Sequence, residues 1–351
     1  MVNKERVILA KKHIYFMDLL NIIGMLAVVF LHSSEYAFTY HPGNRWGISL
    51  VLQVGFIFAV PLFLMLSGAN ILNYRERYST TVFAKKRISK VLLPFIFWSL
   101  AWFAYDIHQG WQQATWQSLF DGFTYNKFQP IFWFFYTIMG FYLAAPILSQ
   151  LTQRANKRII QYFLGLYIVV VLIGSYGLTL IPRPQSIIFS SIPMVATQSI
   201  GYFLVGWYVQ EFPLTKQWRH QIQLFGGLSL LIMLGLAFGL SLQRHYMVRN
   251  VYTIFSIFAF FYSLSIWVSL ENWLANWQPR PWLQPLLRNL ASASLGVYCI
   301  HEFLIYSVEQ YWKLPASSYT HMFLLPVAVY LVSVVITLLL KRIPLIRRLI
   351  P

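Results

Sequence analysis

Residues 16–34, FMDLLNIIGMLAVVFLHSS, decide the fold class of this chain. The stretch is close to the roughly 20 residues that cross a bilayer as a helix, and Asp18 and His32 are its ionisable side chains. The rest of the chain has the same character: 58% of its 351 residues are hydrophobic and 11% are charged. A soluble domain carries about 25% charged residues. We therefore predict an all-α polytopic membrane protein.

Further apolar runs of similar length follow the first, and together they predict about ten transmembrane helices. The runs lie at 14–34, 50–72, 88–106, 131–151, 159–181, 192–210, 222–241, 251–270, 292–311 and 322–341. The sequence contains no visible repeat and no separate soluble domain. We expect residues 1–351 to form a single integral-membrane domain.

The basic residues predict the orientation of these helices. If the N-terminus is cytoplasmic, 21 of the 27 lysines and arginines fall in cytoplasmic segments and 6 fall in outer loops. Cytoplasmic loops carry such an excess in membrane proteins, so both termini are predicted to be cytoplasmic. The net charge of +17 is spread over many loops and forms no single patch, so we expect no nucleic-acid partner. Membrane lipids are the expected surroundings.

Polar side chains form a stripe on the first predicted helix. Residues eleven apart on a helix nearly eclipse, so one face is expected to carry Asp18, Asn21, Met25, His32 and Glu35. Ionisable groups inside a membrane face the bundle interior or a cavity, and they mark functional sites. His32, near the outer end, is therefore a candidate functional residue. The alternative is a structural histidine bonded to a neighbouring helix.

A second polar stripe lies in the ninth predicted helix, SASLGVYCIHEFLIY (292–306). Its members lie close to one face because they recur at i, i+3 and i+4 spacings: Ser294, Tyr298, His301, Glu302 and Tyr306. A His–Glu pair at membrane depth is unusual, and it fits either a functional site or a hydrogen-bonded pair that joins two helices.

A dense basic segment leads into the inner end of the third predicted helix. It carries Arg75, Arg77, Lys85, Lys86, Arg87 and Lys90. These charges fit membrane anchoring and contact with lipid headgroups. Arginine and lysine also suit phosphate, so a cytosolic ligand that carries phosphate is the second interpretation.

Other site signatures are absent from the sequence. We find no Walker loop, dinucleotide glycine pattern, metalloprotease HExxH or GxSxG elbow. One cysteine, Cys299, excludes a cysteine-cluster metal site, and we expect no metal. The aromatic run FWFFYTIMGFY (132–142), which includes Trp133, fits helix packing or stacking on a sugar or an adenine.

Five segments, in order along the chain, together resemble the membrane-bound acyltransferase family 3, in particular its stand-alone O-acetyltransferase branch. They are FMDLLNIIGMLAVVFLHSS (16–34), VPLFLMLSGANIL (60–72), FAKKRISKVLLPFIFWS (83–99), FWFFYTIMGFYLAAPIL (132–148) and SASLGVYCIHEFLIY (292–306). The resemblance implies that acetyl-CoA, or another acyl-CoA, donates a short acyl group in a bacterial cytoplasmic membrane. The acceptor would be a hydroxyl of an extracytoplasmic glycan or lipid-linked sugar.

The resemblance also implies roles for single residues. His32 falls on the family's catalytic histidine, and His301 matches a histidine often found in the penultimate helix. Arg87 falls on the first position of a paired arginine motif implicated in donor binding, with Lys90 on the second. Asn21 departs from the pattern, because many members carry arginine there.

From these positions we hypothesise that His32 is the general base and that Glu35 orients it. An acyl-histidine intermediate is the other route. Tyr298, His301 and Glu302 are candidates to position the substrates or to stabilise the oxyanion. We expect Lys86 to join Arg87 and Lys90 at the donor phosphates, and Asn21 and Trp133 to contact substrate.

Two other functions fit the sequence. One is a small-molecule or proton-coupled transporter, although we see no pair of broken helices in corresponding halves of the chain, which is typical of carriers. The other is a non-enzymatic partner in polysaccharide export. Consumption of acetyl-CoA would separate the enzyme from both.

Overall fold

The computed structural model describes residues 13–153, 157–179, 198–275, 277–344 and 346–350. Every regular element in this part of the chain is a helix. The α-helices are α1 (Tyr15–His32), α2 (Asn44–Gly55), α3 (Ala59–Ile71), α4 (Thr80–Arg87), α5 (Leu93–His108), α6 (Trp116–Thr124), α7 (Trp133–Gln153), α8 (Lys157–Tyr167), α9 (Tyr176–Thr179), α11 (Ile200–Glu211), α12 (Lys216–Arg244), α13 (Ile257–Leu274), α14 (Leu283–Tyr311) and α15 (Leu325–Leu340).

Nine helical segments of the described residues are long and apolar enough to cross a membrane. The prediction of an all-α polytopic membrane protein is confirmed. These nine segments correspond to nine of the ten predicted spans. The sixth, at 192–210, is represented by the 12 residues of α11, and residues 192–197 lie outside the described part. Basic residues of the orientation argument also lie outside it, namely Lys4, Arg6, Lys11, Lys12, Arg154 and Arg183.

Several spans are not continuous α-helices. The second consists of α2 and α3, separated at residues 56–58. The third consists of α4 and α5, joined by a π-helical segment, Ile88–Leu92. Pro94 lies in the first turn of α5, where its missing N–H leaves a carbonyl in the preceding turn without its usual partner. By contrast, α12 is continuous over 29 residues.

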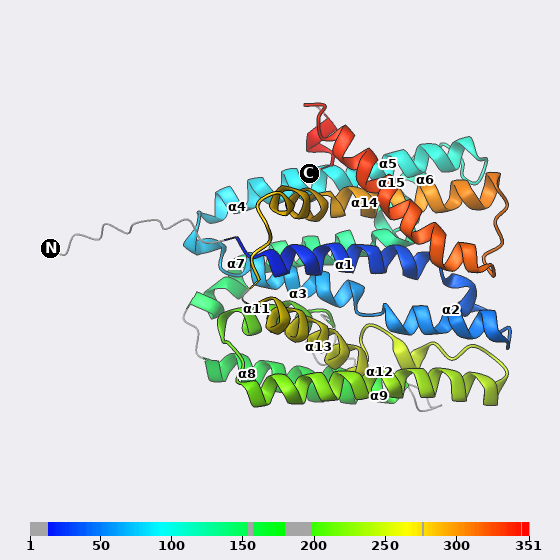
Figure 1. Ribbon diagram of the computed structural model, residues 1–351. Helices are drawn as coiled ribbons and strands as arrows, with labels where there is room; N and C mark the ends of the chain where they lie inside the picture. The colour runs from blue at the N-terminus through cyan, green and yellow to red at the C-terminus, as the bar shows by residue number, and fades with distance from the viewer. Residues whose placement is uncertain (1–12, 154–156, 180–197, 276, 345, 351) are drawn as a thin grey trace.

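Helix α1 lies in the middle of the bundle (Figure 1). Helices α5 and α15 are on one side of it in this view, and α8 and α12 are on the other. It packs against α2, α3, α13, α14 and α15. This position explains the polar stripe of the first span, because a central helix exposes little of its surface to lipid.

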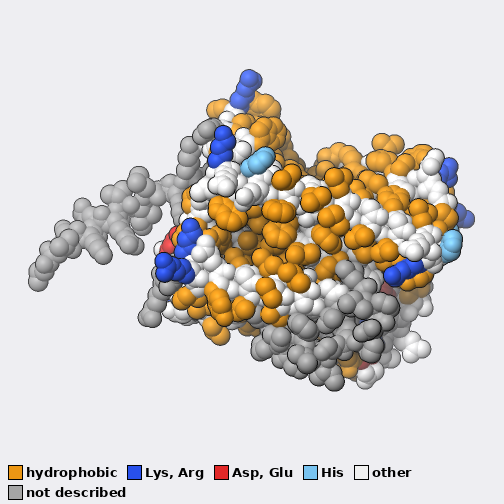
Figure 2. Space-filling model, turned by 90° about the horizontal axis from the view of Figure 1, so that it is seen from below, with side chains coloured by type: hydrophobic (Ala, Val, Ile, Leu, Met, Phe, Trp, Pro, Cys, Tyr) orange, Lys and Arg blue, Asp and Glu red, His pale blue; other side chains and the backbone are white. Residues whose placement is uncertain are grey.

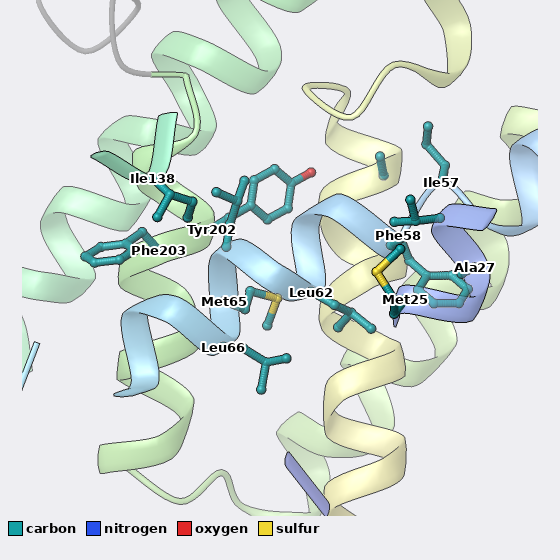
Figure 3. Close-up of a cluster of buried hydrophobic side chains, with 14 of the residues drawn as sticks. Met25, Ala27, Ile57, Phe58, Leu62, Met65, Leu66, Ile138, Tyr202 and Phe203 are labelled. Atoms are coloured by element: carbon teal, nitrogen blue, oxygen red, sulfur yellow. The ribbon is translucent and has the colours of Figure 1, made fainter. Parts of the chain in front are cut away.

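Two glycines allow α3 and α11 to cross closely. A Cβ atom on Gly68 of α3 would lie 1.7 Å from the backbone oxygen of Phe203, and one on Gly206 of α11 would lie 2.1 Å from that of Met65. Small residues permit such backbone contact between membrane helices. Figure 3 shows Met65 and Leu66 of α3 near Tyr202 and Phe203 of α11. The same helix α3 also packs against α1.

The surface is that of a protein surrounded by lipid. Figure 2 shows lysines and arginines near the two ends of the visible face, with hydrophobic side chains between them. Leu143, Ile147 and Leu231 are each more than 60% exposed. Exposed tryptophans lie near helix ends, for example Trp218 at the start of α12 and Trp312 after α14. Tryptophan is enriched at membrane–water interfaces.

Candidate functional site

His32 is the last residue of α1, and side chains from other helices cap the helix end that carries it. The last carbonyls of a helix lack partners within the helix, and buried carbonyls without partners are costly. Here three residues supply donors: Gln53 Nε2 to the Leu31 carbonyl (2.5 Å), His321 Nδ1 to the Ser33 carbonyl (2.9 Å) and Ser49 Oγ to the Ser34 carbonyl (2.6 Å). The backbone around His32 is therefore held from α2 and from the beginning of the last span.

Two carboxylates approach the same nitrogen of His32. His32 Nδ1 lies 3.0 Å from Glu302 Oε1 and 3.2 Å from Glu35 Oε1. The Glu302 side chain is 10% exposed and that of Glu35 is 52% exposed. Because carboxylates accept hydrogen bonds, Nδ1 carries the proton of the neutral ring and Nε2 carries the lone pair.

Glu35 and His32 were predicted to lie on one continuous helical face, and the structure differs from this prediction. α1 ends at His32, and Glu35 begins a separate 3₁₀ turn, Glu35–Phe38. The turn, and not the helix, brings the Glu35 carboxylate to the ring. The structure therefore brings the two side chains together, but Glu35 does not lie on the helical face that was predicted to carry it.

His301 lies beside His32, and Tyr298 lies beside His301, but the donors of both side chains are engaged. The rings of His32 and His301 are 5.4 Å apart. His301 Nδ1 donates to the Val297 carbonyl at 3.0 Å, so Nε2 of the neutral ring holds a lone pair. The Tyr298 hydroxyl donates to the carbonyl of Ile131. In this arrangement neither side chain offers a free donor for an oxyanion.

A cavity of about 310 Å³ begins beside His32. Its lining includes Asn21, Met25, His32, Ser67, Trp133, Tyr142, Ser292, Ser294 and Tyr298, from α1, α3, α7 and α14. Asn21 Oδ1 and Ser294 Oγ are buried and have no hydrogen-bond partner among the described residues. The predicted residues Asn21, Trp133 and Tyr298 therefore share one cavity with His32. Its unpaired polar atoms suit a ligand with amide groups.

Tyr142, which lines the inner part of the cavity, also contacts the basic segment. The guanidinium of Arg87 lies 5.3 Å from the ring centroids of both Tyr142 and Phe83. Its Nε is buried and has no hydrogen-bond partner among the described residues. Lys86, in contrast, lies over the ring of Tyr78 at 4.2 Å. Arg87 is thus the member of the basic segment placed next to the cavity.

Lys341, which was not predicted as a site residue, belongs to the same end of the cavity. Its Nζ donates to the carbonyl of Ser292, a cavity residue, at 2.6 Å. Burial, and secondarily the charge of nearby Lys90, lower the pKa of Lys341. In sequence it was one of four basic residues in the C-terminal tail, and nothing in its spacing singled it out. The contact arises because α14 and α15 pack together.

Two members of the predicted stripes lie elsewhere. Asp18 pairs with His13 at 2.5 Å. Tyr306 contacts the rings of Trp102 and Trp111.

The described residues also contain one His and Glu cluster with the spacing of metal ligands, formed by His32, His301 and Glu302.

Residues 14–342 match a family model described as an acyltransferase domain. No curated protein and no solved structure matches the chain. The match covers more than nine-tenths of the sequence, and it includes every helix that contributes to the cavity.

Proposed function

The chain belongs to acyltransferase family 3, and we propose that it moves an acetyl or other short acyl group from cytosolic acyl-CoA to a glycan or glycolipid hydroxyl outside the cytoplasm. One observation carries the proposal. A histidine paired with two carboxylates lines a cavity whose inner part touches Arg87 through Tyr142. A base at one end and a cation at the other suit a long, phosphorylated acyl donor.

The donor would enter from the side of the basic segment. Arg87, Lys90 and Lys341 would hold the phosphates of CoA, because guanidinium and ammonium groups bind phosphate strongly. The pantetheine arm would then occupy the cavity, where Asn21 Oδ1 and Ser294 Oγ are free to bond its amide groups. The thioester would lie beside His32. Asn21 would make this contact as a neutral side chain, in the place where many relatives carry arginine.

The chemistry then follows from the tautomer of His32. Nε2 would accept the proton of the acceptor hydroxyl, and the oxygen would attack the thioester carbonyl. The imidazolium that forms would be stabilised by Glu302 and Glu35, which already face Nδ1. Collapse of the tetrahedral intermediate would break the C–S bond, and His32 would return the proton to the departing CoA thiolate. Both substrates are thereby converted without net change in the protein.

Transport is less well supported than acyl transfer. A carrier with inverted repeats would have broken helices at matching positions of its two halves. The second span is broken between α2 and α3, but its counterpart in the second half is the continuous helix α12.

Substitution of His32 tests the proposal. Purified protein in detergent would be given radiolabelled acetyl-CoA and a lipid-linked glycan, and His32→Gln would be compared with the wild type. Glutamine cannot take up a proton near neutral pH. We expect the transfer rate to fall by roughly 10²- to 10⁴-fold, while equilibrium binding of acetyl-CoA changes little.

The control is His220→Gln, at an exposed position of α12, which should behave as wild type. Retention of most activity in His32→Gln would exclude His32 as the base. Absence of any acetyl-CoA consumption by the wild type, across a panel of glycan acceptors, would favour transport or export.

A further inference from the structure

Three potential metal ligands converge at the outer end of the cavity. His32 comes from α1, and His301 and Glu302 come from α14. One nitrogen or oxygen atom from each side chain lies within 4.8 Å of the other two. Two imidazoles and one carboxylate, with a fourth position left for water, are a ligand set used by zinc sites.

His301 is already arranged as a ligand. Its Nδ1–H is bonded to the Val297 carbonyl at 3.0 Å, which leaves the lone pair on Nε2. Histidines that bind metals make this type of bond with their other nitrogen, and it fixes the tautomer. The side chain is fully buried, and Nε2 has no hydrogen-bond partner among the described residues. A buried acceptor without a partner is costly, and a metal ion would remove that cost.

The distances fit a small ion after a modest adjustment. Zinc with bonds of about 2.0–2.1 Å in a tetrahedron holds its ligand atoms about 3.4 Å apart. Glu302 Oε1 is 3.0 Å from His32 Nδ1 and 3.8 Å from His301 Nε2. The carboxylate of Glu35, 3.2 Å from His32 Nδ1, adds negative charge beside the site. Nitrogen ligands favour zinc-class metals over Mg²⁺ or Ca²⁺, which prefer oxygen.

We propose that His32, His301 and Glu302 bind a zinc-class divalent ion, and that the bound ion inhibits the protein. The binding does not depend on the proposed function, whereas the inhibition rests on it. A metal on His32 Nδ1 displaces the hydrogen from that nitrogen. The remaining hydrogen of the neutral ring is then on Nε2, so Nε2 cannot accept a proton from the acceptor hydroxyl. The metal and the catalytic tautomer therefore exclude each other.

Zinc binding is the first test. Full-length protein with a tag free of histidine would be treated with chelator and titrated with ZnCl₂ by calorimetry in a non-coordinating buffer. His301→Asn keeps an N–H donor near the Val297 carbonyl but removes the Nε2 ligand. We expect one tight site in the wild type and at least about 100-fold weaker binding in His301→Asn, since even outer-shell partners of metals contribute about 10- to 100-fold.

Matched variants keep the result interpretable. His220→Asn, at an exposed position, should bind zinc as the wild type does, and Glu302→Gln should lose binding as His301→Asn does. Thermal unfolding would identify any variant that fails to fold. X-ray absorption of the zinc complex should give two imidazole nitrogens. Tight binding that survives both His301→Asn and Glu302→Gln, or no tight site in the wild type, would overturn the site.

Activity supplies the second test. Zinc should reduce acyl transfer in proportion to occupancy, and chelator should restore it. Full occupancy of the site by zinc without loss of acyl transfer would overturn the proposed inhibition. A finding that acyl transfer requires zinc would overturn it as well. If the wild type transferred no acyl group at all, the proposed function would fail while the calorimetric result still decided the metal site.

Discussion

The two glutamates that face His32 are alike in distance from its Nδ1 but differ in burial. Glu302 is buried between α1 and α14, whereas the Glu35 side chain is half exposed. Interactions between exposed charges are weakened by water, and they contribute at most about 1 kcal/mol. Glu302 should therefore be the main partner of the histidine.

Matched substitutions of the glutamates test this difference. Glu302→Gln should lower the transfer rate on the order of 10²- to 10⁴-fold, because the imidazolium loses its buried counter-charge. Glu35→Gln should cost less than about tenfold. The measurement is the initial rate at saturating acetyl-CoA. Equal losses in the two variants would contradict a leading role for Glu302.

The proposed function also assigns binding of the donor phosphates to Arg87 and Lys90. Arg87→Ala combined with Lys90→Ala should weaken binding of acetyl-CoA by at least about 100-fold, since hydrogen bonds to charged groups contribute about 1.5–3 kcal/mol each. Wild-type affinity should also fall with added salt. Lys85→Ala, an exposed position of the same segment, is the control. Unchanged affinity in the double variant would assign these residues to lipid anchoring.

Among the helices, the contact of α3 with α11 has the least room for change. Both helices contribute a glycine whose missing side chain lets the partner's backbone approach. α3 in turn packs against α1, and it contributes Val60, Phe63 and Ser67 to the cavity. The shape of the site therefore depends on a crossing that contains no catalytic residue.

Gly68→Ala should consequently destabilise the protein. The added methyl group would meet the Phe203 carbonyl, and overpacking of this kind costs about 1–3 kcal/mol or more. We expect a lower thermal unfolding midpoint in detergent and a reduced yield of folded protein. Gly235→Ala of α12, where an added Cβ meets nothing within 4 Å, should leave the midpoint unchanged or slightly raised. Equal midpoints for the two variants would argue against the close crossing.

At the scale of the whole molecule, the proposed function requires one orientation of the chain in the membrane. Under the proposed function, the donor phosphates would bind on the cytoplasmic side, and the acceptor glycan would reach His32 from the other side. The first and last helices run in opposite directions in Figure 1, so the start of α1 and the end of α15 lie toward the same end of the bundle. The charge distribution of the loops predicts that this end is cytoplasmic.

Single cysteines test that orientation. Thr39 and Thr81 are both exposed, and they lie in loops or helix ends predicted to face opposite sides of the membrane. In a Cys299→Ser background, a membrane-impermeant maleimide applied to intact cells should label Thr39→Cys. Thr81→Cys should be labelled only after the membrane is opened. Labelling of both from outside would overturn the predicted topology.

The membrane-spanning fold and the polar residues of α1 and α14, among them the candidates His32 and His301, could be predicted from the sequence, whereas Arg87 was singled out from its basic segment by the family resemblance. These features depend on local patterns, because hydrophobic length and the helical repeat act within about 20 neighbouring residues. The break between α2 and α3 could not be predicted in this way. The run across residues 50–72 is mostly apolar, and although Gly55 and Pro61 flank the break, both residue types are also tolerated within continuous membrane helices.

The partners within the site required the tertiary structure. The packing of distant helices decides which of the two glutamates, Glu302 or Glu35, is buried against His32. The same packing brings Lys341 to the carbonyl of Ser292. The free lone pair of His301 depends on a hydrogen bond made within α14 and on the neighbours that leave Nε2 unpaired. Side-chain pairing across helices is set by their rotation and depth, and neither quantity is encoded in the hydrophobic pattern of any one helix.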